Sequence, residues 1–111
     1  MIWILTFILG LIWCQLISHF GASILLHRHY SHRTIKKVPV WFEIVAMFGL
    51  MIAYIRTPIG WIASHRMHHL DSDGPTDPHS PVRKGFWPVL FTIWDVPKIP
   101  IKHARDLYAN P

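Results

Sequence analysis

The sequence predicts an all-α integral-membrane fold, in which one transmembrane helix is followed by interfacial or cytosolic helices that carry histidine clusters. Three observations lead to this fold class. Residues 1–26 contain no Lys, Arg, Asp or Glu, and all 11 Lys and Arg residues come after them. Six of the nine histidines lie in two short clusters, 27–32 and 65–69. Both clusters directly follow stretches that are mostly apolar.

Residues 1–26 are long enough to cross a bilayer. At about 1.5 Å of rise per residue, a helix of this length exceeds the roughly 30 Å hydrocarbon core. A secretory signal peptide is the poorer alternative, because no basic residue precedes the apolar run and Ile24-Leu25-Leu26 ends it in place of small residues. The single cysteine, Cys14, lies within this predicted span, where we expect it to be a small buried hydrophobe.

A basic segment, residues 27–37, follows the predicted span and contains the first histidine cluster. Lys and Arg are enriched on the cytoplasmic side of spans, so we expect both histidine clusters on the cytoplasmic face. The net charge of +5 then reflects membrane topology and headgroup contact. Nucleic-acid binding is not expected, since no basic helix carries the polar side chains that read bases. The four cations of this segment are Arg28, Arg33, Lys36 and Lys37.

Residues 38–56 form a second apolar stretch, which we expect to begin as a helix near Pro39 and to end before Pro58. By length it could cross the bilayer, but one crossing would put the two histidine clusters on opposite faces. Glu43 also makes a crossing costly. We therefore predict a buried or interfacial apolar helix.

The remainder of the chain, from residue 61, divides into three parts. Residues 61–81 hold the second histidine cluster, on a helix to residue 70 and then a loop rich in Asp, Ser, Gly and Pro. Residues 85–101 are aromatic but too interrupted by proline to span. We expect them to be an interfacial segment, since Trp favours the headgroup level. The tail from residue 102 is polar.

The second cluster has the spacing of a metal site on a helix. Successive helical residues turn by about 100°, which places His65, His68 and His69 within roughly 60° of one another. Three imidazoles on one face can approach a metal from one side, while Arg66 is left to face headgroups or solvent. A zinc-protease pattern is excluded because Arg66 occupies the position of its glutamate. An all-imidazole set suits Zn, Cu, Fe or Ni.

The first cluster is less regular. His27 and His32 would be about 140° apart on a regular helix, so they converge only if the helix unwinds or ends between them. On spacing alone, His29 could replace His27. Histidines that follow a transmembrane segment can also be interfacial or proton-carrying residues. Two clusters on one predicted face favour metal ligands.

These motifs resemble the two histidine boxes of the integral-membrane fatty acid desaturases. His27-Arg28-His29-Tyr30-Ser31-His32-Arg33 is similar to the first box, His-x4-His followed by Arg, and His65-Arg66-Met67-His68-His69 to the second, His-x-x-His-His. Asp77-Pro78-His79-Ser80-Pro81, followed by Gly85-Phe86-Trp87, resembles the segment after the second box in acyl-CoA and bacterial desaturases.

The resemblance implies O2-dependent desaturation of a fatty acyl chain at a di-iron centre (cofactor Fe). It carries no ligand role to His29. For Asp77 and His79 it leaves two roles open, support of the ligands and support of the loop fold, and favours the structural role. The metal ligands that it implies are His27, His32, His65, His68 and His69.

The resemblance also implies the partners. The substrate would be a fatty acyl chain on CoA, on a lipid or on acyl-carrier protein, and an electron donor such as ferredoxin or cytochrome b5 would supply electrons at the lipid bilayer. Ile62-Ala63-Ser64 stands where acyl-CoA enzymes commonly show Ala-Arg-Asp, which favours the other two carriers. Candidate walls of an apolar acyl channel, with core packing as the equal alternative, are Val45, Phe48, Met51 and Ile52.

The sequence departs from the family in one main respect, because the family's third box, another His-x-x-His-His, is absent. We therefore expect the N-terminal part of a desaturase, a remnant, or one half of a split enzyme, with about half of the ligands and incomplete alone. The alternatives are a related membrane di-iron hydroxylase or ketolase, and a non-enzymatic membrane fragment that binds metal or haem.

Overall fold

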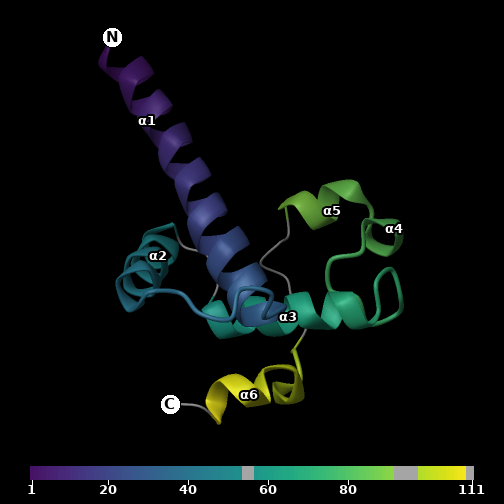
Figure 1. The fold of residues 1–111 in the computed structure, drawn as a ribbon. Coiled ribbons are helices and arrows are strands. Elements are labelled where there is room, and N and C mark those ends of the chain that lie inside the picture. Colours follow the sequence, from purple (N-terminus) through teal and green to yellow (C-terminus); the bar gives the residue numbers. More distant parts are fainter. Residues whose placement is uncertain (54–56, 92–97, 110–111) are drawn as a thin grey trace. The chain divides into compact units, whose positions relative to one another are not determined.

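A computed structural model describes residues 1–53, 57–91 and 98–109, and every regular element in these ranges is a helix (Figure 1). The predicted all-α membrane fold is confirmed, with one long apolar helix at the N-terminus. The chain divides into two compact units, Met1–Ile55 and Arg56–Pro111.

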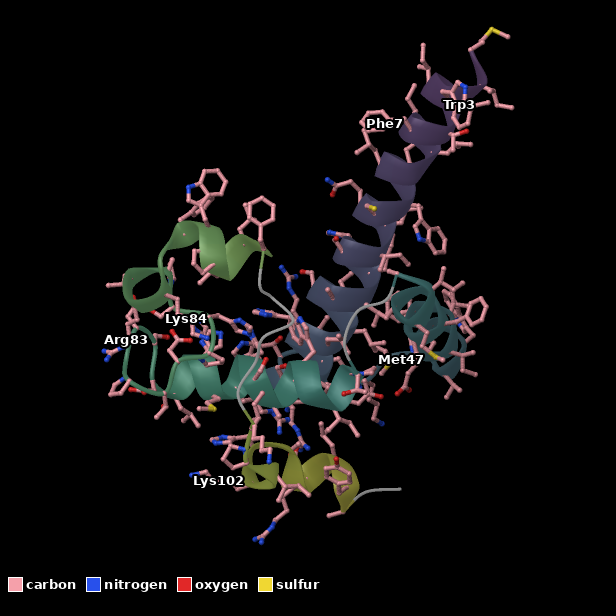
Figure 2. The ribbon with its side chains drawn as sticks, turned by 180° about the vertical axis from the view of Figure 1, so that it is seen from behind. Trp3, Phe7, Met47, Arg83, Lys84 and Lys102 are labelled. Atoms are coloured by element: carbon pink, nitrogen blue, oxygen red, sulfur yellow. The ribbon has the colours of Figure 1, made fainter. Side chains whose placement is uncertain are left out.

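The first unit begins with helix α1 (Ile2–Leu16), which continues without a break into helix η1 (Ile17–Ser31), as Figure 1 shows. Together they form a 30-residue helix whose length and apolar composition suit a membrane span. The large apolar side chains of α1 are exposed, including Trp3 and Phe7 (Figure 2). Cys14 is exposed as well, so the expectation that it is buried was wrong. A helical segment such as α1, apolar on all sides and exposed in the described residues, is suited to lipid contact.

η1 is a π-helix, in which each N–H bonds the carbonyl five residues earlier. It continues past residue 26, where the predicted span ends, and includes most of the first histidine cluster. The hydroxyl of Ser31 donates to the carbonyl of Leu26 at 2.8 Å, which follows the same five-residue spacing. π turns are rare and are often found at functional sites.

Helix α2 (Val40–Ile52) packs against η1 through two glycines. A Cβ on Gly21 would meet the side chain of Leu50 at 2.8 Å, and a Cβ on Gly49 would collide with Ile17. These close approaches fix which face of α2 points to η1. Residues 54–56 of the predicted 38–56 helix lie outside the described residues.

The outer face of α2 carries the four residues considered for an acyl channel. Their side chains are between 54% and 69% exposed, so core packing does not account for them in the described residues. Their role in a channel stays a prediction. The four residues are Val45, Phe48, Met51 and Ile52.

The second unit is built on helix α3 (Pro58–Leu70), which starts before the predicted residue 61. Thr57 caps it, since its hydroxyl accepts the Gly60 N–H at 3.3 Å, and Pro58 occupies the first helical position. Both are ordinary start signals, so this earlier beginning was readable from the sequence.

Short elements follow α3. A turn-rich loop of residues 71–80 leads to helices α4 (Pro81–Lys84) and α5 (Phe86–Phe91). Residues 92–97 of the predicted interfacial segment lie outside the described residues. The polar tail is folded: 3₁₀ helix η2 (Ile101–Ala104) and helix α6 (Arg105–Tyr108) follow one another, and η2 packs against α3.

Candidate metal centre

The three histidines of α3 lie together on one face of the helix. The ring centroid of His65 is 6.3 Å from that of His68 and 4.6 Å from that of His69, and the latter two are 5.4 Å apart. The Nε2 atoms of His65 and His69 approach to 3.1 Å. Two imidazole nitrogens on one ion, each at about 2.1 Å and at right angles, would be about 3 Å apart, so this pair fits a shared metal.

The His65 ring is further held by an aromatic neighbour one helical turn earlier. Trp61 stacks on it with a centroid distance of 4.9 Å and an interplanar angle of 14°. Residues four apart on a helix lie on the same face, which explains why this contact forms locally. The indole restricts the rotation of the imidazole and so helps to orient its nitrogen atoms.

His68 is oriented by a carboxylate from the following loop. Its Nδ1 lies 2.9 Å from each oxygen of Asp77, a side chain that is buried. An imidazole that donates its Nδ1 proton to a carboxylate keeps the lone pair on Nε2, the nitrogen then available to a metal. This arrangement is the usual outer support of a histidine ligand, and it gives Asp77 a position that sequence spacing did not reveal.

The same carboxylate is held by backbone donors. The N–H groups of Asp73 and His79 donate to Asp77 at 2.8 Å each. Burial by itself would raise the pKa of Asp77, but these two donors and His68 outweigh it, so the pKa is lowered. The lowered pKa favours the ionised carboxylate of Asp77, which can accept the Nδ1 proton of His68.

His79 is tied to the buried side of α3. Its Nε2 lies 3.1 Å from the hydroxyl of Ser64, which itself donates to the carbonyl of Trp61 at 3.2 Å. The hydroxyl is thus placed to accept the Nε2 proton. This contact connects the loop to the helix, in keeping with a structural role for His79.

In the first unit, His27 and His32 come together at the C-terminal end of η1, which His32 directly follows. Their ring centroids are 4.6 Å apart, and the His32 N–H donates to the His27 carbonyl at 3.0 Å. The sequence suggested that the helix would have to unwind or end between them. The structure agrees: η1 is a π-helix, which is wound more loosely than an α-helix and brings positions five apart towards the same face, and it ends at Ser31, just before His32.

The imidazole of His29 makes a different contact from those of His27 and His32. Its Nδ1 lies 2.7 Å from the carbonyl of Ile35, which accepts its proton. The N–H groups of Thr34 and Ile35 donate to the Arg28 carbonyl at 2.9 and 3.3 Å, which closes the same turn. His29 therefore has a local role in ending η1.

Arg66 does not face headgroups or solvent as expected. Its guanidinium makes a two-pronged contact with Asp106, at 2.6 and 3.1 Å, and also donates to the His103 carbonyl at 3.0 Å. Its side chain is only 19% exposed. No spacing signal points to a partner 40 residues away, so sequence reasoning missed this contact.

Comparison with known proteins supports the resemblance found in the motifs. The chain is 39% identical over 71 residues to delta-9 acyl-lipid desaturase 2 of Arabidopsis thaliana, which covers 64% of this chain and 22% of that protein. It is 40% identical to delta-9 acyl-lipid desaturase 1 of the same plant, over 60% of this chain and 21% of the relative. A hex-5-enoyl-[acyl-carrier protein] acetylenase of Moorena producens is 38% identical, over 70% of this chain and 25% of that protein.

These relatives confirm the similarity to the fatty acid desaturases. The chain spans about a quarter or less of the length of these curated relatives. No protein-family model matches the chain. No solved structure matches it.

Proposed function

We propose, from the premise that this chain is related to the fatty acid desaturases, that it supplies histidine ligands to the di-iron centre of a membrane fatty acyl desaturase. The ligands would come from both units, on η1 and on α3. The observation that carries this proposal is the group of three imidazoles on α3, one of them held by Asp77. The proposed ligands are His27, His32, His65, His68 and His69.

The donor set fits iron. Every proposed ligand is a neutral imidazole nitrogen, a donor that suits iron among other transition metals. When bound, the di-iron centre would supply the activation of O2 that removes two hydrogens from an acyl chain. The chain's own residues would hold and orient the iron ligands: Trp61 fixes the ring of His65, and Asp77 fixes the tautomer of His68.

The substrate we propose is an acyl chain carried by a lipid or by acyl-carrier protein. The relatives named above act, by their names, on acyl lipids or on an acyl-carrier protein conjugate. An unactivated methylene pair offers no polar handle, so apolar walls must orient it. The exposed apolar face of α2 is our candidate for part of such a wall. An electron donor such as ferredoxin or cytochrome b5, and histidines on the cytoplasmic face, belong to the same proposal.

One of the relatives supports a second possible reaction, the formation of a triple bond. The relative from Moorena producens is an acetylenase, a name that denotes triple-bond formation. An enzyme with the same iron ligands could therefore act on a chain that already holds a double bond. Product analysis separates the two activities, because one yields an alkene and the other an alkyne.

The test uses the product of the complete gene that contains this chain, expressed in a host whose fatty acids are then analysed. We expect a new unsaturated fatty acid and bound non-haem iron. His68→Ala should abolish both while membrane insertion is unchanged, and His29→Ala serves as the matched control because its imidazole bonds the Ile35 carbonyl. Full iron content in His68→Ala, or haem absorbance without non-haem iron, would refute the proposal.

A further inference from the structure

A group of large apolar side chains on α4 and α5 is mostly exposed in the part of the chain that the structure describes. Five of them are between 51% and 77% exposed, although they lie within ten consecutive residues. Exposed apolar groups of this density mark contact surfaces rather than ordinary protein surface. We name this group the 82–91 surface; it consists of Val82, Phe86, Trp87, Leu90 and Phe91.

The surface is held in a fixed local frame. Ser80 is fully buried, and its hydroxyl accepts the Arg83 N–H at 3.2 Å and donates to Asp73 at 2.7 Å. The Lys84 ammonium donates to the Pro78 carbonyl at 3.0 Å. These bonds fasten α4 to the loop that also carries Asp77, and α5 packs against α4, so the surface belongs to the folded second unit.

A glycine turns the chain between the two short helices. Gly85 has φ 84° and ψ 155°, a conformation that side chains with a Cβ rarely adopt. After this turn, the rings on α5 pack on one another: Trp87 and Phe91 stack at 5.8 Å, and Phe86 meets Trp87 edge-on at 5.1 Å. The aromatic groups therefore form one continuous patch.

The composition of the patch points to lipid. Residues 81–91 include two cations, Arg83 and Lys84, and no acidic residue. Figure 2 shows both cations on α4, next to α5, from which aromatic rings project. Aromatic residues beside cations suit the boundary between acyl chains and headgroups. The apolar rings can lie among the acyl chains there, and the cations can contact anionic headgroups. A specific protein partner would instead call for a polar rim.

We propose that the 82–91 surface inserts into the headgroup region of the bilayer, with Arg83 contacting anionic headgroups. The second unit would then have a membrane contact separate from the N-terminal span. That span lies in the same chain and keeps the surface near the membrane, which favours a weak second attachment. The proposal does not depend on iron.

The experiment uses the full chain with Cys14→Ser, reconstituted in phosphatidylcholine vesicles with and without phosphatidylglycerol. A fluorescent label on Leu90→Cys is compared with one on Ser72→Cys, an exposed position in the 71–80 loop. Quenching by nitroxide-labelled lipid should be at least about twofold stronger at position 90, as expected for an inserted apolar residue. Quenching by aqueous iodide should be weaker there.

Two further variants distinguish insertion into lipid from burial against protein. Arg83→Gln should remove the effect of phosphatidylglycerol on quenching at position 90. Trp87→Ser combined with Phe91→Ser should lower lipid quenching towards that of the loop position. The proposal is overturned if position 90 is as accessible to iodide as position 72. It is equally overturned if position 90 is shielded from both quenchers, because a protein partner or a second copy of the chain would then cover it.

Discussion

Asp77 shows how a single residue can set the tautomer of a candidate histidine ligand. Its carboxylate is charged and buried, and it accepts from His68 Nδ1, so it selects the tautomer with a free lone pair on Nε2. From the sequence, Asp77 was expected to support either a ligand or the fold of the loop, and the loop role was favoured. Its pairing with His68 depends on the fold of the loop, because Gly74 and the turn around it bring residue 77 back to α3.

Asp77→Asn should weaken iron binding without unfolding the second unit. The amide keeps the shape of the carboxylate but loses its charge, and loss of such outer support typically costs about 10- to 100-fold in metal affinity. Iron retention during dialysis against a chelator measures the effect. Asp71→Asn is the matched control, since Asp71 accepts from Thr76 and not from a histidine. Equal iron retention in the two variants would contradict the role of Asp77.

At the scale of elements, sequence patterns predicted helices better than their exact form. The apolar run and the histidine spacing indicated a span and a helical second cluster, and the fold class is confirmed. The π-helical form of η1 was not predictable, because an apolar pattern does not fix which carbonyl each N–H bonds. The start of α3 was readable at Thr57-Pro58, whereas the contact between Arg66 and Asp106 was not, because it joins distant parts of the chain.

The packing of η1 on α2 depends on two glycines, Gly21 and Gly49. Gly49→Val should destabilise this packing, because the added carbons would occupy the space of Ile17. Overpacking of this kind costs about 1–3 kcal/mol. Thermal unfolding of the protein in detergent measures the change. Gly10→Val is the matched control, since a Cβ at Gly10 meets nothing within 4 Å. A similar melting temperature for both variants would show that the two helices do not depend on this contact.

The attachment of the C-terminal segment to α3 depends on Arg66. Asp106→Asn should loosen residues 101–108, because the two-pronged contact loses its charge. Asp106 is partly exposed, so we expect a cost below about 1 kcal/mol. Hydrogen exchange of η2 and α6 should rise, while α3 keeps its protection. Arg105→Gln, at an exposed neighbour, should leave exchange unchanged. Unchanged exchange in Asp106→Asn would exclude this attachment.

At the scale of the whole molecule, the central proposal is that imidazoles from both units bind one iron centre. The sequence indicated the candidate ligands through their spacing and through resemblance. Spacing could not tell how His27 and His32 converge, since a regular helix would separate them. Within each unit the rings lie close together, which supports the proposal separately for η1 and for α3.

The most direct test is the iron content of the complete gene product carrying His32→Ala, His68→Ala, or both. A shared centre is a coupled unit, so either single variant should lose nearly as much iron as the double variant. His29→Ala should retain its iron. If each single variant instead lost only part of the iron and the losses added up in the double variant, the two histidine groups would be independent sites, and the proposal of one centre would be contradicted.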